Sequence, residues 1–167
     1  MSFQCGDQVV YGIHGVCRIV DVEKKSVDRK TVEYYVLRPT AQVDATYYVP
    51  VHNEAAVAKM RKMLTAAELN GLLDSDEILA DCWIPEENLR KDRYRKLIAR
   101  ADCAELIGMI RSLHLHKRRQ LAAGKKFHLC DENFLKDAQR LIASEVSQIL
   151  EIQPGEVEGY IRSRVEK

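Results

Sequence analysis

The sequence predicts an α+β protein, with a small N-terminal antiparallel β-barrel in residues 1–52 and an all-α C-terminal domain of about five helices in residues 53–167. Short stretches rich in β-branched and aromatic residues occupy the barrel region, and turn residues separate them. Beyond it, apolar residues recur at helical spacing. With 31% charged and 46% hydrophobic residues, the composition excludes a disordered chain, a collagen-like fibre and a coiled-coil rod.

Four stretches of the first domain are expected to form strands: Val9–Tyr11, Val16–Val22, Thr31–Leu37 and Thr46–Val49. Gly12–Gly15 is read as a turn, and Lys24–Lys30 as a polar hairpin loop. Pro50 ends the last strand because proline lacks an N–H for the ladder. Short antiparallel strands of this kind are expected to close into a barrel, since closure removes exposed edges.

Helix starts are indicated by residues that satisfy free backbone N–H groups. Thr65 and Glu68 form a capping box, Pro85 suits a first helical position, and aspartates can cap further helices. The predicted helices begin near Thr65, Pro85, Asp102, Asp131 and Gln153. The first four end near Asp74, Ala101, Ala123 and Leu150. Gly124 follows the third helix, where a glycine commonly ends one.

Positive charge is concentrated in residues 88–126. This segment contains twelve Lys or Arg and three acids, a net charge of +9 in a chain whose net charge is +1. A basic block in an otherwise acidic protein indicates a polyanionic partner. A solvated helical face is the other interpretation of the same charges.

Within this block, Arg93, Lys96 and Arg100 fall on one stripe of a predicted helix. Three cations on one stripe repel one another unless an anion faces them, and phosphates are the obvious candidate. A second cluster, Lys117–Arg119, would also complement the negative end of its own helix. Lys125 and Lys126 follow in the next loop.

Trp83 is the only tryptophan and immediately precedes the basic helix. It is either a packing residue or an aromatic wedge acting against bases next to a basic surface.

We predict no catalytic residue, metal site, cofactor or small-molecule substrate. His114 and His116 lie about 200° apart on a helix, so they do not readily share one metal ion. No apolar run approaches the roughly 18 residues of a membrane helix. Residues 1–7 lack the pattern of a signal peptide, and five cysteines without paired spacing fit a reducing cytoplasm.

The order of motifs resembles the CarD family of bacterial transcription regulators, and the first domain also resembles the polymerase-interacting domain of transcription-repair coupling factor. The resemblance in the first domain rests on Phe3, Gly6–Asp7, Val9–Tyr11, His14–Val16, Tyr34–Leu37 and Val49–Pro50. In the second domain it rests on Trp83, Arg93–Tyr94, Asp102, Glu105–Leu106, Ile110–Arg111, Gly124–Lys126, Asp131, Ala138 and Glu145.

The resemblance implies a Tudor-like barrel that binds the β subunit of bacterial RNA polymerase, and a helical domain that contacts promoter DNA at the upstream edge of the transcription bubble. It implies polymerase contacts at Lys25 and Tyr48. The DNA contacts implied by the resemblance and the basic block are Trp83, Arg90, Arg93, Lys96, Arg100, Lys117, Arg118, Lys125 and Lys126. The sequence departs from the family pattern at Tyr48, where the family has a basic residue, and at Ile84–Asn88, which includes two acids after the tryptophan.

These inferences predict a non-enzymatic, cytoplasmic and nucleoid-associated regulator that binds RNA polymerase and promoter DNA and stabilises the open complex, for example at ribosomal RNA promoters. A protein-only adaptor is the alternative, in which the helical domain binds a second protein instead of DNA. The salt dependence of DNA binding distinguishes the two.

Overall fold

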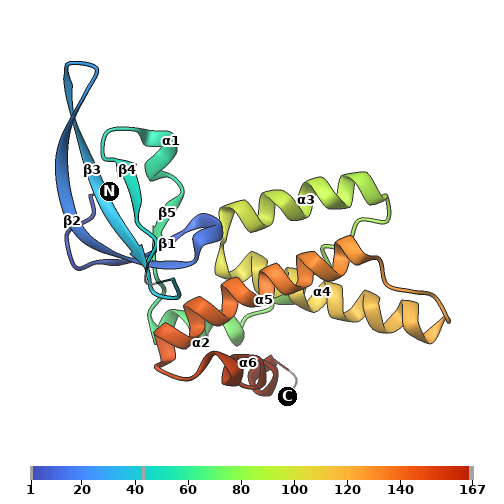
Figure 1. Cartoon of the computed structure of the whole chain (residues 1–167). Coiled ribbons are helices and arrows are strands. Elements are labelled where there is room, and N and C mark those ends of the chain that lie inside the picture. Colours follow the sequence, from blue (N-terminus) through green and yellow to red (C-terminus); the bar gives the residue numbers. More distant parts are fainter. Residues whose placement is uncertain (1, 43, 166–167) are drawn as a thin grey trace. The chain divides into compact units, whose positions relative to one another are not determined.

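An antiparallel sheet builds the N-terminal unit of the chain, residues 1–63, and helices build the second unit, residues 64–167. The structure is a computed structural model that describes residues 2–42 and 44–165. Figure 1 shows the strands and helices of each unit. The α+β class predicted from the sequence is confirmed.

Five strands form the sheet within the described residues, in the order β4-β3-β2-β1-β5 with every neighbouring pair antiparallel. They are β1 (Gln8–Tyr11), β2 (Val16–Val27), β3 (Lys30–Pro39), β4 (Tyr47–Pro50) and β5 (Met60–Lys62). The predicted loop 24–30 is mostly strand, because β2 and β3 continue to a two-residue turn at Asp28 and Arg29. Both turn residues have positive φ, 49° and 65°, the conformation whose twist matches that of the strands.

The expectation of a closed barrel is not met. Among the described residues, β4 and β5 are edge strands and do not pair with each other, so the sheet is open. Residues after 53 were expected to be helical, yet β5 pairs with β1 and buries Met60. Only the short helix α1 (Glu54–Val57) separates β4 from β5. The sheet unit therefore extends to Met63, beyond the boundary at residue 52 expected from the sequence.

One face of the sheet carries the core of the first unit. Its buried members are Phe3, Val9, Cys17, Ile19, Tyr35, Leu37, Val49 and Met60. Burial raises the pKa of the Cys17 thiol to about 11, so this cysteine behaves as a small apolar side chain. Because side chains alternate along a strand, Tyr34 and Tyr48, which adjoin the core residues Tyr35 and Val49, point to the opposite face. Lys25 lies on that face too, since its ammonium sits over the Tyr48 ring.

The helical unit contains α2 (Ala66–Leu73), α3 (Glu87–Arg100), α4 (Cys103–Ala122), α5 (Leu129–Leu150) and α6 (Val157–Val165). Two predicted starts are confirmed: Thr65 and Glu68 form a capping box on α2, and Asp102 caps α4 by accepting from the Glu105 N–H at 3.1 Å. Helices α4 and α5 pack as a hairpin connected by residues 123–128 (Figure 1). No helix of the described chain is long and apolar enough to cross a membrane.

Two other helix starts differ from the prediction. Pro85 precedes α3, and the Glu86 carboxylate caps that helix by accepting from the N–H groups of Asn88 and Leu89. Helix α5 begins at Leu129, so Asp131 lies inside its first turn and does not cap it. The Asp131 carboxylate is instead buried and accepts two hydrogen bonds from the Arg90 side chain of α3.

Candidate functional site

The first candidate surface lies on the face of the sheet opposite its core. Lys25 of β2 and Tyr48 of β4, the two predicted polymerase contacts, are brought together: the Lys25 ammonium lies 3.8 Å from the centroid of the Tyr48 ring. The Tyr34 ring, on the intervening strand β3, packs edge-on against Tyr48 at 6.3 Å. Tyr48 is 45% exposed. Sheet pairing thus builds one exposed aromatic and cationic patch from residues far apart in the sequence.

This patch adjoins unpaired backbone, because β4 is an edge strand. The ammonium of Lys25 also lies 4.0 Å from the Glu23 carboxylate, an exposed pair of small energetic value. An edge strand flanked by an accessible cation and two tyrosines can pair with an extended segment of another protein and recognise its side chains.

The second candidate surface is an exposed basic ridge on α3, formed by Arg93, Lys96 and Arg100. The ammonium of Lys96 pairs with Asp92 at 3.0 Å, and Arg100 pairs with Glu105 at 3.2 Å. Arg93 forms no ion pair with any described residue. Exposed pairs of this kind contribute little to stability, so these cations can exchange their partners for phosphates.

A third group of cations surrounds the end of α4 and the following loop. Lys117 is partly buried, and its hydrogen bond and charge lower the pKa of Glu132, 2.8 Å away. Arg118, Lys125 and Lys126 are exposed. Two apolar side chains of the same hairpin end are also exposed, Leu121 at 56% and Leu129 at 74%.

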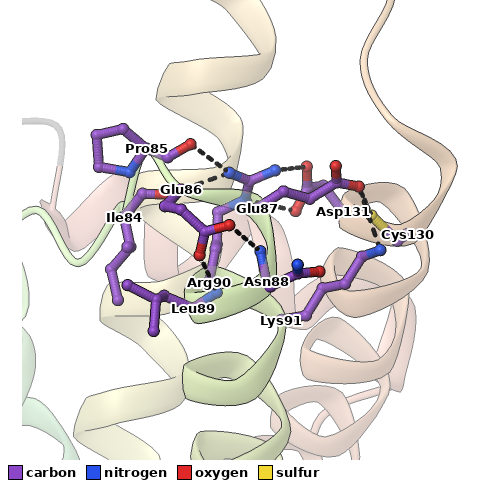
Figure 2. A network of polar contacts seen from close by, with 10 residues as sticks. All are labelled: Ile84, Pro85, Glu86, Glu87, Asn88, Leu89, Arg90, Lys91, Cys130 and Asp131. Atoms are coloured by element: carbon purple, nitrogen blue, oxygen red, sulfur yellow. Dashed lines mark hydrogen bonds and ion pairs between the residues drawn. The ribbon is translucent and has the colours of Figure 1, made fainter.

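Arg90, which is predicted from the sequence to contact DNA, is buried. Its side chain is 3% exposed, and its Nε and one terminal nitrogen donate to both carboxylate oxygens of Asp131 at 3.0 and 2.9 Å (Figure 2). The other terminal nitrogen donates to the carbonyls of Ile84 and Pro85. The hydrogen bonds to Asp131 raise the pKa of Arg90. This guanidinium is engaged inside the fold and is not accessible to a phosphate, so the prediction of Arg90 as a DNA contact is wrong.

Trp83 is held by two side chains of the helical unit. Its ring stacks on His116 with a centroid distance of 4.3 Å, and the Arg90 guanidinium carbon lies 4.1 Å from its ring centroid. Asp81 accepts from the Trp83 N–H, and one of its oxygens lies 3.0 Å from Nε2 of His116. Although partial burial opposes it, these hydrogen bonds lower the pKa of Asp81. Of the two roles that the sequence left open for Trp83, these contacts favour packing.

Sequence reasoning missed Asp81, His116 and Asp131 as partners in this network. Asp131 was assigned to a helix cap, which is where a single aspartate before an apolar repeat usually belongs. Its true partner, Arg90, lies 41 residues away, and no local spacing links the two. Within the described residues, no group of three or more His, Cys, Asp or Glu side chains is placed to hold a metal ion.

Comparison with known proteins supports a specific assignment for the first unit. Residues 3–64 match the family model described as CarD-like/TRCF RID domain. No curated protein matches the chain. The matched range coincides with the sheet unit, residues 1–63, and leaves most of the helical unit unmatched.

The sheet unit therefore belongs to the class of RNA polymerase-interacting domains found in CarD-like proteins and in transcription-repair coupling factor. The match covers the sheet unit of the chain, residues 3–64, and shows a CarD-like domain there.

Removal of the negative charge of Asp131 should severely destabilise the helical unit. In the Asp131→Asn variant, the Arg90 charge stays buried without a full counter-charge, and we expect a loss of about 3–5 kcal/mol in the free energy of unfolding. Urea unfolding measures this loss. Asp92→Asn removes the acid of an exposed pair and should cost less than about 0.5 kcal/mol. Equal losses in the two variants would contradict a structural role for the buried pair.

Replacement of Trp83, which packs between His116 and Arg90, should also lower the stability of the helical unit. Because Trp83 is half-buried, we expect Trp83→Ala to cost about 2 kcal/mol, below the value for a fully buried aromatic. Trp83→Phe keeps a ring for stacking on His116 and should recover part of this loss. Thermal melting compares the variants. A near-native melting temperature for Trp83→Ala, with a shortened open-complex lifetime, would support the wedge role instead.

Proposed function

We propose that this protein is a non-enzymatic transcription regulator that binds the β subunit of RNA polymerase through its sheet unit and promoter DNA through its helical unit, and so stabilises the open complex. The observation that carries the proposal is the CarD-like/TRCF RID match over residues 3–64, which makes RNA polymerase the partner of the sheet unit. This role would place the protein in the bacterial cytoplasm, associated with the nucleoid.

The polymerase contact is best supported at the patch formed by Lys25, Tyr34 and Tyr48. All three side chains lie on one face, next to the edge strand β4. An extended segment of the β subunit could add to this edge through backbone hydrogen bonds, while the patch selects its side chains. Tyr48 stands where the family has a basic residue, and Lys25 supplies a positive charge directly over its ring. The patch thereby keeps a cation at the contact.

The DNA contact is best supported on the basic ridge of α3 and on the exposed cations Arg118, Lys125 and Lys126. Cations on exposed helix faces bind phosphates without reading sequence, and each contact releases condensed counterions. The exposed Leu121 and Leu129 lie near these lysines in the chain, and apolar side chains can act against base steps beside a basic surface.

The regulator would act by binding the open promoter more tightly than the closed one. A ligand shifts an equilibrium only by its difference in affinity for the two states. A tenfold shift requires about 1.4 kcal/mol, which a few phosphate contacts made only with the opened DNA can supply.

The alternative is a protein-only adaptor, and one observation favours it. Two of the three cations on the α3 ridge already pair with acids of the same unit, Lys96 with Asp92 and Arg100 with Glu105. A face that satisfies its own charges in this way is also typical of a solvated or protein-binding helix.

Charge reversal on the sheet should weaken polymerase binding. Lys25→Glu removes the cation above Tyr48, and we expect the affinity of the full chain for RNA polymerase to fall about tenfold. Lys24→Glu is the matched control, because the neighbouring residue of β2 carries the same charge change on the opposite face. Biolayer interferometry with immobilised polymerase measures both. Equal affinities for the two variants would remove this patch from the interface.

Loss of the basic ridge should flatten the salt dependence of DNA binding. Replacing Arg93, Lys96 and Arg100 by alanine should reduce the slope of log affinity against log salt by about 0.9 per contact, or roughly 2.7 in all. Alanine at Lys24, Lys30 and Lys59 removes equal charge from the sheet unit and should leave the slope nearly unchanged. An unchanged slope in the ridge variant would favour the adaptor.

A further inference from the structure

The helical unit contains a groove of about 880 Å³ between α4, α5 and the C-terminal segment that ends in α6. Its lining residues all belong to this one unit. None of them is a polymerase contact, and Arg118 alone also belongs to the proposed DNA surface. The groove is therefore largely separate from both proposed interfaces.

Apolar side chains from three helices line much of this groove: Ile107, Ile110, Ile142, Val157, Ile161 and Val165. Ile107, Ile142 and Val157 are buried and form the floor of the groove. The other three side chains are half-buried and keep apolar surface that a ligand can cover. Such a lining favours the apolar part of a ligand, since each buried CH₂ group contributes about 0.8 kcal/mol.

Cations from the same three helices share the groove: Arg111, Arg118, Lys136, Arg140 and Arg162. Among residues 2–42 and 44–165, Glu158 is the only acid that lines it, and this carboxylate pairs with Arg162 at 2.8 Å. Arg118 and Lys136 form no ion pair with any described residue. Arg118 and Lys136 are therefore the two cations of the lining that the proposal rests on, because both are exposed and no acid of the described residues pairs with them.

Two uncharged polar groups lie among these cations. Nε2 of His114 is 3.2 Å from the Gln139 side-chain nitrogen, and both residues line the groove. Burial lowers the pKa of His114, against the opposing effect of Glu158 and with the support of Arg162, Lys117 and Arg118. Neutral His114 and Gln139 can therefore offer hydrogen bonds to a polar head group.

The combination of lining and size selects the class of ligand. Nucleic acid would use the cations and leave the half-buried apolar surface of Ile110, Ile161 and Val165 uncovered. The volume lies within the roughly 300–1,000 Å³ of small-molecule sites, which are mostly apolar with a few convergent polar groups. We propose that this groove binds a small amphiphilic anion, whose apolar body packs on the isoleucine and valine side chains and whose carboxylate or phosphate head pairs with the arginine and lysine side chains. This site goes beyond the proposed role in transcription.

The test is calorimetric titration of the full chain with octyl phosphate, octanol and inorganic phosphate. We expect octyl phosphate to bind with one-to-one stoichiometry and a dissociation constant below about 1 mM. Octanol lacks the charge and inorganic phosphate lacks the chain, so each should bind at least about tenfold more weakly. Equal affinity for octanol and octyl phosphate, or no binding of octyl phosphate at 1 mM by the same scale, would overturn the proposal.

Two variants locate the site. Lys136→Glu reverses an exposed, unpaired cation of the groove and should weaken octyl phosphate binding about tenfold. Arg95→Glu makes the same charge change at an exposed α3 position outside the lining and should bind as the unaltered protein does. Ala143→Phe adds bulk to the lining and should abolish binding, and its thermal melt reports whether it folds. Equal weakening by Lys136→Glu and Arg95→Glu would mean that only the overall charge of the protein matters, and would overturn the proposed site.

Tighter binding of an acidic amphipathic helical peptide at the groove, with no octyl phosphate binding, would assign the groove to a protein partner instead.

Discussion

The buried ion pair between Arg90 and Asp131 is the interaction on which the helical unit depends. It joins α3 to α5, and the same guanidinium binds the carbonyls of Ile84 and Pro85. It also contacts Trp83, whose ring stacks on His116 of α4. A charge removed from water is tolerated only when its hydrogen bonds are satisfied, so these groups hold one another in a single arrangement. One arginine thereby positions three helices and the segment that precedes them.

That arrangement determines which cations of the basic segment are available to a partner. Arg90 and Arg93 belong to the same helix and differ by less than one turn, yet one is buried and the other is exposed. The inward position allows α3 to pack, and the outward positions form the basic ridge. The positive charges of residues 88–126 therefore have two different roles: Arg90 is buried and structural, whereas the cations of the ridge lie on the surface. The surface part alone can supply the counterion release on which DNA binding would depend.

The sheet unit makes its interaction surface in a different way. Its core lies on one face, and the alternation of strands places Lys25, Tyr34 and Tyr48 together on the other. An open sheet leaves β4 with unpaired backbone groups beside this patch. In a closed barrel, the backbone groups of β4 would be paired with another strand and would not be available to a partner. The backbone groups on this edge of β4 can therefore pair with a strand of another protein.

Local signals in the sequence determined the α+β class, the order of most strands and helices, and the caps at Thr65 and Asp102, because each depends on residues within one or two turns. The resemblance to the CarD family directed attention to Lys25 and Tyr48, but only β-sheet pairing brought them together. Tertiary structure alone decided the pairing of β5, the open edge, the burial of Arg90 against Asp131 and the amphipathic groove of α4, α5 and α6. Each of these joins segments distant in the chain, and a contact between distant segments depends on packing, which residue spacing does not encode.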